Sequence, residues 1–197
     1  MMKVLIDPGH GIDTPGKRSP DGKFREYLWN RQVADLLLDR LTAMGVDASL
    51  VVTETNDISL STRVQRVNRV CTQLGASDVL LVSIHANAAG DGSAWMGAKG
   101  WSCYTTKGKT ESDSLAECLY DAFEAEFPER KIRKDMSDGD RDWEEDFCVI
   151  KKSKCPAVLL ENFFYDNREE CAWLLLEGTK VRIVDAIVAG LKKFLKK

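Results

Sequence analysis

The first half of the chain alternates short apolar runs with longer segments of helical periodicity. Three runs, at residues 3–7, 48–53 and 78–84, have the length of β-strands, and the third is almost entirely apolar. Between them lie residues 26–45 and 60–75, in which apolar side chains recur every three or four positions. Two strands joined by a crossover helix normally lie parallel in one sheet. This order therefore restricts the chain to an α/β fold around a mainly parallel sheet.

The second half adds three predicted strands and three predicted helices. The strands are residues 100–106, 147–150 and 157–161, and the helices are residues 111–127, 167–178 and 179–197. Residues 128–146 carry charges of both signs with little periodicity, which predicts a long surface loop. Long loops in compact domains are often functional lids or rims, or are disordered. At 197 residues, the chain is expected to form a single domain over residues 1–197.

Composition and charge exclude several classes of function. Apolar residues make up 44% of the chain and charged residues 30%, which is typical of a globular domain. The net charge of −3 argues against a nucleic-acid partner, because such proteins are usually basic. No apolar run is long enough for stable membrane insertion, and the first residues do not form a signal peptide. We therefore expect synthesis in the cytoplasm.

The six cysteines do not form a C-x-x-C pair, and we expect them to be reduced, structural residues. One disulfide, between Cys148 and Cys155, stays open as an alternative. The lysines at the end of the chain suit the last turn of a helix, where cations interact favourably with the helix dipole.

Both histidines of the chain follow predicted strands. His10 lies in DPGHG after the first strand, and His85 lies in SIHAN directly after the third. The carboxyl ends of parallel strands meet at one edge of a sheet, where open α/β folds bind ligands. The pattern therefore indicates a shared site for His10 and His85. The alternative is two unrelated loop histidines.

Two histidines and one carboxylate would supply the three protein ligands of a catalytic zinc ion. The candidate carboxylates are Asp7, Glu26 and Glu54. Asp7 is too close to His10 in sequence to reach the same ion easily. Glu26 begins the first predicted helix and Glu54 follows the second strand, and spacing alone does not choose between them.

A further acid, Glu161, follows four apolar residues in PAVLLENFF. Burial at the end of such a strand raises the pKa of a carboxyl group, which suits a residue that accepts and returns a proton. The alternative is a glutamate that caps a loop or pairs with an arginine.

Two other chemistries fit the sequence poorly. Residues 11–18, GIDTPGKR, nearly match a phosphate-binding loop, but Arg18 replaces the hydroxyl residue that would hold magnesium. Pro20 also falls where the helix of such a motif would have to begin. A cysteine nucleophile is disfavoured because none of the cysteines lies at a strand-to-helix turn.

These residues resemble the zinc-dependent N-acetylmuramoyl-L-alanine amidases of the third amidase family. The matching segments are VLIDPGHG, the glutamate that opens the first helix, LSTRVQRVN, SIHANA and PAVLLENFFYDNREE, and they occur in the family's order over nearly the whole chain. The resemblance implies a twisted, mostly parallel (mixed) six-stranded sheet flanked by helices on both faces. It also implies one Zn²⁺ ion held by His10, Glu26 and His85, with Glu161 as the catalytic glutamate. It therefore favours Glu26 over Glu54.

The implied reaction is hydrolysis of the amide between the lactyl group of N-acetylmuramic acid and L-alanine in peptidoglycan. Asn87 is then expected to hydrogen-bond the substrate, with a turn residue as the alternative. The loop 128–146 is expected to rim the site, where Trp143 would stack on a sugar or pack on the domain. The alternatives are a non-catalytic peptidoglycan-binding module and a different zinc peptidase or amidohydrolase on the same fold.

Two positions depart from the family's pattern. Glu54 stands where the family usually has arginine, and Asn162 stands where it often has glycine, which affects how the peptide of the substrate is gripped. We expect neither a wall-binding domain nor an export signal, and in this the chain resembles a phage or prophage lysin. The resemblance implies release by a holin-like partner, followed by action on the cell wall.

Overall fold

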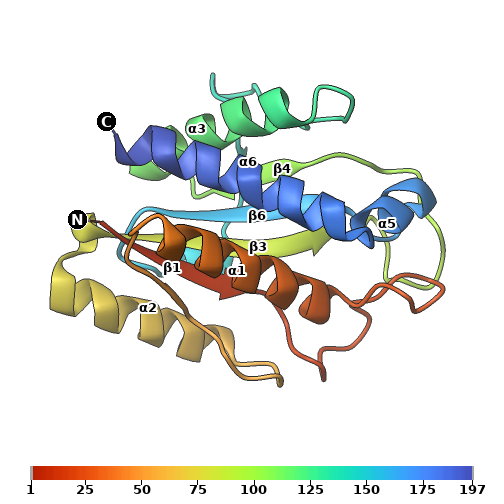
Figure 1. Ribbon diagram of the computed structural model, residues 1–197, viewed down its shortest axis with the longest axis horizontal. Helices are drawn as coiled ribbons and strands as arrows, with labels where there is room; N and C mark the ends of the chain where they lie inside the picture. The colour runs from red at the N-terminus through yellow and green to blue at the C-terminus, as the bar shows by residue number, and fades with distance from the viewer. Residues whose placement is uncertain (1, 197) are drawn as a thin grey trace.

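A single six-stranded sheet organises the computed structural model, which describes residues 2–196 (Figure 1). In the sheet order β2-β1-β3-β6-β4-β5, β1 pairs in parallel with β2 and β3, and β3 pairs in parallel with β6. β4 is antiparallel to β6, and β5 is parallel to β4. The strands are β1 (Lys3–Pro8), β2 (Ala48–Leu50), β3 (Val79–Asn87), β4 (Ser102–Thr105), β5 (Trp143–Glu144) and β6 (Ala157–Phe164). The predicted mixed, mostly parallel sheet is confirmed.

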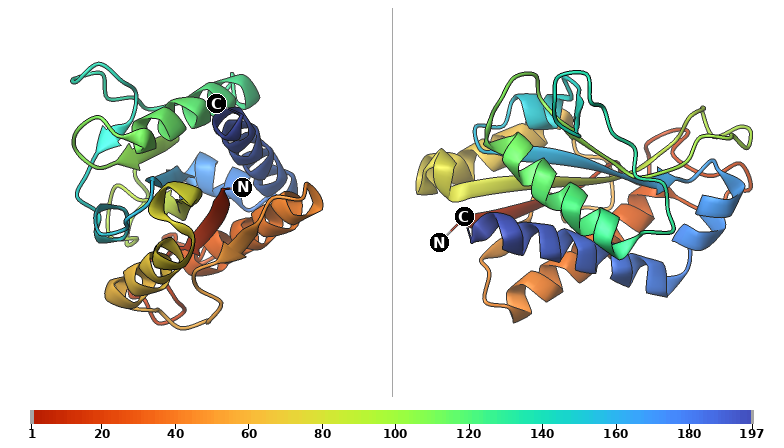
Figure 2. Two further views of the ribbon diagram at one scale, coloured as in Figure 1. Left: turned by 90° about the vertical axis from the view of Figure 1, so that its left-hand side faces the viewer. Right: turned by 90° about the horizontal axis from the view of Figure 1, so that it is seen from above.

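Helices cover both faces of the sheet, as expected. They are α1 (Glu26–Ala43), α2 (Leu60–Leu74), α3 (Glu111–Glu126), α4 (Cys148–Lys151), α5 (Arg168–Leu174) and α6 (Glu177–Leu195), with a short 3₁₀ helix at Ala76–Asp78. α6 lies between α1 and α3 on one face, whereas α2 and α4 lie on the other (Figures 1 and 2). Gly190 of α6 allows the close contact with α3, because a Cβ there would lie 2.8 Å from Leu119.

The central strands bury both of their faces. In β1, Val4 and Ile6 belong to the core beneath α1 and α6, while Leu5 belongs to the core beneath α2. β3 continues the same alternation, with Leu80 in the first core and Leu81 in the second. This explains why these strands are almost uniformly apolar, as is usual for a parallel sheet covered by helices on both sides.

Several predicted elements differ from the structure. Residues 147–150 were expected to form a strand, but Cys148–Lys151 is a helical turn, α4, whose Val149 and Ile150 are buried. A short apolar run does not distinguish a strand from a buried helix, so the hydrophobic pattern led to the wrong prediction here. The strand that completes the six-stranded sheet is instead β5, which lies inside the predicted loop 128–146. The second strand is shorter than expected, and the final helix begins at Glu177 rather than at residue 179.

The six cysteines are free thiols, so Cys148 and Cys155 do not form a disulfide. Lys192 and Lys193 lie in the last turn of α6, as predicted, and Lys193 contacts Asp121 of α3 at 2.5 Å, while Lys197 lies outside the described residues. Within residues 2–196, the helices are all too short or too polar to cross a membrane.

Candidate metal and catalytic site

Three neighbouring strands bring the predicted site residues to one edge of the sheet. His10 follows β1, His85 lies near the end of β3, and Glu161 lies in β6, directly opposite His85 in the strand register. Glu26 is the first residue of α1, and its backbone N–H donates to the carbonyl of Lys17 at 3.0 Å. The loop between β1 and α1 therefore returns Glu26 to the edge that carries the two histidines.

His10, Glu26 and His85 form a compact cluster. Each residue offers one ligand atom, and these atoms lie within 4.8 Å of one another. Glu26 Oε1 lies 3.3 Å from His10 Nε2 and 3.1 Å from His85 Nδ1. The two imidazole rings meet edge to face, with their centroids 4.9 Å apart. Two nitrogens and one oxygen thus face a common point, as the donors of a small cation would.

The backbone around His10 is constrained to present its ring. His10 adopts a left-handed conformation with φ of 62°, which is uncommon for a residue other than glycine and costs energy. Its carbonyl accepts hydrogen bonds from Arg31 Nη1 at 2.9 Å and Arg63 Nη2 at 3.3 Å. Gly9 lies against the other imidazole, because a Cβ there would be 2.0 Å from His85 Cε1.

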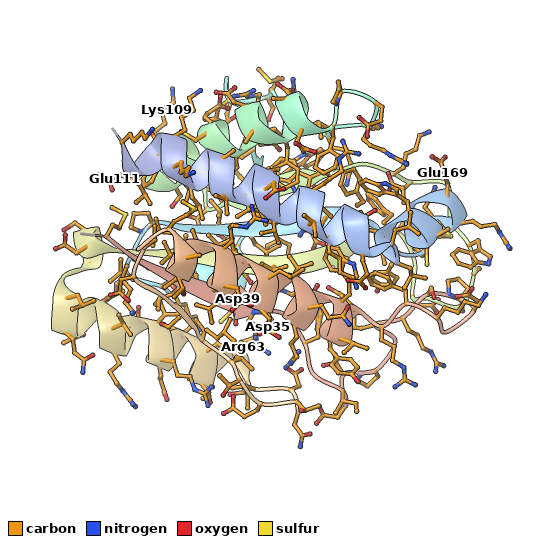
Figure 3. All side chains as sticks on the ribbon, viewed as in Figure 1. Asp35, Asp39, Arg63, Lys109, Glu111 and Glu169 are labelled. Atoms are coloured by element: carbon orange, nitrogen blue, oxygen red, sulfur yellow. The ribbon has the colours of Figure 1, made fainter. Side chains whose placement is uncertain are left out.

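Arg63 of α2, labelled in Figure 3, is the main support beneath this loop. Its buried guanidinium donates from Nη1 to Asp7 Oδ1 at 2.6 Å and to the carbonyl of Pro8 at 2.7 Å. Ser83 of β3 donates to the other oxygen of Asp7 at 2.9 Å. Asp7 is therefore part of the scaffold. Its positioning partner Arg63 belongs to the segment LSTRVQRVN, but no role could be assigned to Arg63 from the sequence alone.

The electrostatics of the cluster favour a deprotonated Glu26. Burial alone would raise the pKa of Glu26, but hydrogen bonds and charges from His10 and His85 outweigh it and hold the pKa well below its usual range. Burial lowers the pKa of His10, against the influence of Glu26. For His85, burial also acts to lower the pKa, yet the Glu26 carboxylate prevails and raises it.

Glu161 lies beside the cluster with different electrostatics. Burial raises its pKa to about 7, and the negative charge of Glu26 acts in the same direction against His85, Lys17 and Arg133. Its Oε2 atom is buried and has no hydrogen-bond partner among residues 2–196. A carboxyl group with a pKa near neutrality can both accept and donate a proton.

Glu54, the rival candidate, lies outside the cluster. Its two carboxylate oxygens accept hydrogen bonds from Arg66, with Oε1 2.5 Å from Nη2 and Oε2 2.9 Å from Nη1. Its carbonyl accepts two hydrogen bonds from Arg31. The position that departs from the family's usual arginine therefore has a local structural role.

Asn87 and Asn162 both contact backbone near the site. The side-chain oxygen of Asn87 accepts a hydrogen bond from the N–H of Ala88 at 2.8 Å, which fits the turn alternative, and its contact with substrate stays a prediction. Asn162 donates to the carbonyl of His85 at 2.8 Å and accepts from the indole of Trp101 at 3.2 Å. The departure from glycine at position 162 thus adds a link that holds the His85 backbone.

The segment 128–146 runs beside β4. Its Ile132 bridges to Trp101, and its Trp143 packs on Tyr104 with ring centroids 6.3 Å apart. Trp143 therefore packs on the domain, which was one of the two alternatives predicted for it. The expected role of this segment as a rim of the site stays a prediction.

Known proteins resemble this chain over nearly its whole length. The family model described as N-acetylmuramoyl-L-alanine amidase matches residues 4–193. The N-acetylmuramoyl-L-alanine amidase LytC of Bacillus subtilis is 31% identical over 188 residues, which are 95% of this chain and 34% of LytC. An endolysin of Bacillus phage SPP1 is 24% identical over 199 residues, which are 98% of this chain and 65% of the endolysin. The chain thus spans less than two thirds of the length of either relative.

A solved structure matches over the full fold. The crystal structure of an N-acetylmuramoyl-L-alanine amidase from Clostridium difficile 630 has a TM-score of 0.82 and 28% identity, covering 100% of this chain and 97% of the other. The sheet order and the helices on both faces are therefore those of a known catalytic fold.

Proposed function

This chain belongs to the N-acetylmuramoyl-L-alanine amidase family, and from that premise we propose that it is a zinc-dependent peptidoglycan hydrolase. It cleaves the amide bond between the lactyl group of N-acetylmuramic acid and L-alanine. The observation that carries this proposal is the convergence of His10, Glu26 and His85 beside Glu161 at one edge of the sheet.

The three clustered residues fit a zinc ion. Two imidazole nitrogens and one carboxylate oxygen are a common donor set for catalytic zinc, and tetrahedral bonds of about 2.0–2.1 Å put the donors about 3.3 Å apart. The separations of 3.3 Å and 3.1 Å from Glu26 Oε1 to the two nitrogens match that spacing. Glu26 Oε2 is buried and has no hydrogen-bond partner in the described part of the chain, and the carboxylate is deprotonated, as a ligand must be.

His10, Glu26 and His85 would hold the ion. The zinc would supply a Lewis acid for the lactyl carbonyl and a water nucleophile at neutral pH. Arg31, Arg63 and Asn162 keep the two histidines in place by binding their backbone carbonyls. Preorganisation of this kind removes the need to rearrange the ligands during the reaction.

Glu161 moves the proton. In its ionised form it accepts a proton from the attacking water as the oxygen forms its bond to the lactyl carbon. It then gives that proton to the nitrogen of L-alanine as the C–N bond breaks, so that a carboxylic acid and an amine leave. A pKa of about 7 suits both roles, because the group exchanges a proton readily near neutral pH.

The test pairs turnover with metal content. Glu161→Gln is expected to keep the zinc stoichiometry of the wild type and lose at least about 100-fold in hydrolysis of purified peptidoglycan. Glu169→Gln, an exposed glutamate on α5 (Figure 3), is the matched control and is expected to behave as the wild type. Chelation should abolish hydrolysis, and added zinc should restore it. Wild-type hydrolysis by Glu161→Gln would show that the assigned proton carrier is wrong.

Product analysis separates the alternatives. Free stem peptides with a new L-alanine amino terminus identify the amidase, whereas loss of a terminal residue identifies a peptidase. Binding without any new amino terminus identifies a non-catalytic module. The resemblance to a phage endolysin supports an action on the cell wall, and a holin-like partner is the proposed route to it.

A further inference from the structure

A cavity of about 370 Å³ lies in the segment of chain that joins His10 to Glu26. It is formed by the loop between β1 and α1 together with the start of α1, and it contains the cations of Lys17, Arg18 and Arg25. Lys17 connects it to the cluster, since its Nζ lies 3.9 Å from Glu26 Oε2. The proposed hydrolysis assigns no role to Arg18 or Arg25.

The two arginines are held side by side. Arg18 and Arg25 form an antiparallel β-bridge across the loop, which puts their side chains next to each other on the same face. Like charges directly opposite in such a pair destabilise the folded protein. The loop therefore maintains a charge arrangement that works against its own stability.

Arg25 is unfavourable for a second reason. It occupies the N-cap of α1 and makes no side-chain capping hydrogen bond. Serine, threonine, asparagine and aspartate are preferred at this position, and a cation there opposes the positive end of the helix dipole. A residue that is unfavourable for its local secondary structure and brings no other structural gain is a candidate for a functional role.

The nearby acids do not neutralise this pair. Asp13 lines the same cavity, but its Oδ1 accepts the backbone N–H of Asp57 at 2.6 Å. Asp21 pairs with Lys23 at 3.8 Å. In the described part of the chain, neither Arg18 nor Arg25 forms an ion pair with a carboxylate. The cavity thus has a net positive charge although the chain as a whole carries −3.

We infer that this cavity binds a free carboxylate of the stem peptide, held by Lys17, Arg18 and Arg25. The inference rests on the proposed function and names the part of the substrate that the enzyme recognises when it selects a peptide for cleavage. The amide-bearing sugars of the glycan are neutral, so the negative charge near the scissile bond lies on the peptide. Ile12 and Tyr27 provide apolar walls for its aliphatic carbons.

The test compares two synthetic muramyl peptides that differ in one chemical feature. One carries free peptide carboxylates, and in the other these are primary amides. The zinc-loaded wild type is expected to have a KM about tenfold lower for the carboxylate substrate, because hydrogen bonds to charged groups are the stronger ones. Arg18→Gln and Arg25→Gln should raise that KM about tenfold, with kcat and the KM of the amidated substrate little changed.

Stability provides a readout that a merely structural role would not give. Arg25→Gln is expected to leave the Tm unchanged or to raise it, because it removes a like-charge pair. Arg69→Gln, which removes an exposed arginine from α2, is the matched control and should keep the wild-type preference between the two substrates.

An equal KM for the two substrates in the wild type, or a wild-type preference in both cavity variants, would overturn the inference. If the wild type cleaves neither substrate, the proposed reaction is wrong, and the cavity is then judged by calorimetric titration of the same two peptides. The inference is supported if the wild type binds the carboxylate peptide more tightly than the amidated one and Arg25→Gln abolishes that difference. Equal binding of the two peptides by the wild type overturns it.

Discussion

Gly9→Ala should impair zinc binding while the rest of the fold stays intact. A methyl carbon at position 9 would lie 2.0 Å from Cε1, 2.3 Å from Nε2 and 2.5 Å from Nδ1 of His85. Non-bonded carbon atoms settle about 3.5 Å apart, so the imidazole must move by about 1.5 Å. Zinc–ligand distances tolerate changes of only about 0.2 Å. The variant therefore loses His85 as a ligand.

The expected magnitude follows from this loss. Changes to groups that merely orient a ligand weaken metal binding about 10- to 100-fold, so displacement of the ligand itself should reach at least about 100-fold. That factor corresponds to about 2.8 kcal/mol of zinc-binding free energy. The strands beneath the site keep their apolar contacts, so we expect the far-ultraviolet circular dichroism spectrum to stay that of the wild type.

The assay is competition for zinc between the protein and a colorimetric chelator, with peptidoglycan hydrolysis measured in parallel. Gly178→Ala is the matched control, because a Cβ at this position of α6 meets no atom within 4 Å. It should bind zinc as the wild type does and gain a little stability, since alanine has less conformational freedom than glycine to lose on folding. Wild-type zinc affinity in Gly9→Ala would refute the assignment of His85.

Two further predictions concern stability. Arg63→Met leaves Asp7 buried without its ion-pair partner and should lower the free energy of unfolding in urea by about 3–5 kcal/mol. Arg66→Met, on the same helix as Arg63, breaks a partly exposed pair with Glu54 and should cost less than about 1 kcal/mol, and equal losses would contradict the argument. Burial, with the negative charges around it, raises the pKa of Asp142 to about 7. Between pH 4 and pH 7 the folded state therefore holds a proton that the unfolded state has lost, and this group's contribution to stability falls as the pH rises. Asp142→Asn removes that contribution. In urea titrations, the stability of the variant relative to the wild type should therefore increase from pH 4 to pH 7. A pH-independent difference would show that the carboxyl group is ionised in the folded protein.

The predicted fold depended on signals that are local in sequence. The apolar run that begins at Lys3 and the periodic segment after Glu26 identify a strand and a helix without reference to the rest of the chain. Local signals failed where they were shortest. Residues 147–150 are too few to show a period, and β5 is a strand only because β4 pairs with it.

The candidate site divides in the same way. The sequence by itself put His10, His85 and Glu161 at the ends of predicted strands, and parallel pairing then brings those positions to one edge. It did not decide between Glu26 and Glu54 as the third ligand, and only the resemblance to a family favoured Glu26. That choice depends on the path of the loop after His10, which is set by contacts between distant segments.

Only the tertiary structure showed what supports and surrounds that site. Arg63 lies 53 positions from His10, whose carbonyl it binds, and Asn162 lies 77 positions from His85, whose carbonyl it holds. The arginines at 18 and 25 become neighbours because the loop folds into a bridge. Hydrogen bonds and charge–charge contacts act over a few ångströms in space whatever the separation along the chain. Such partners can therefore be identified only once the chain has folded.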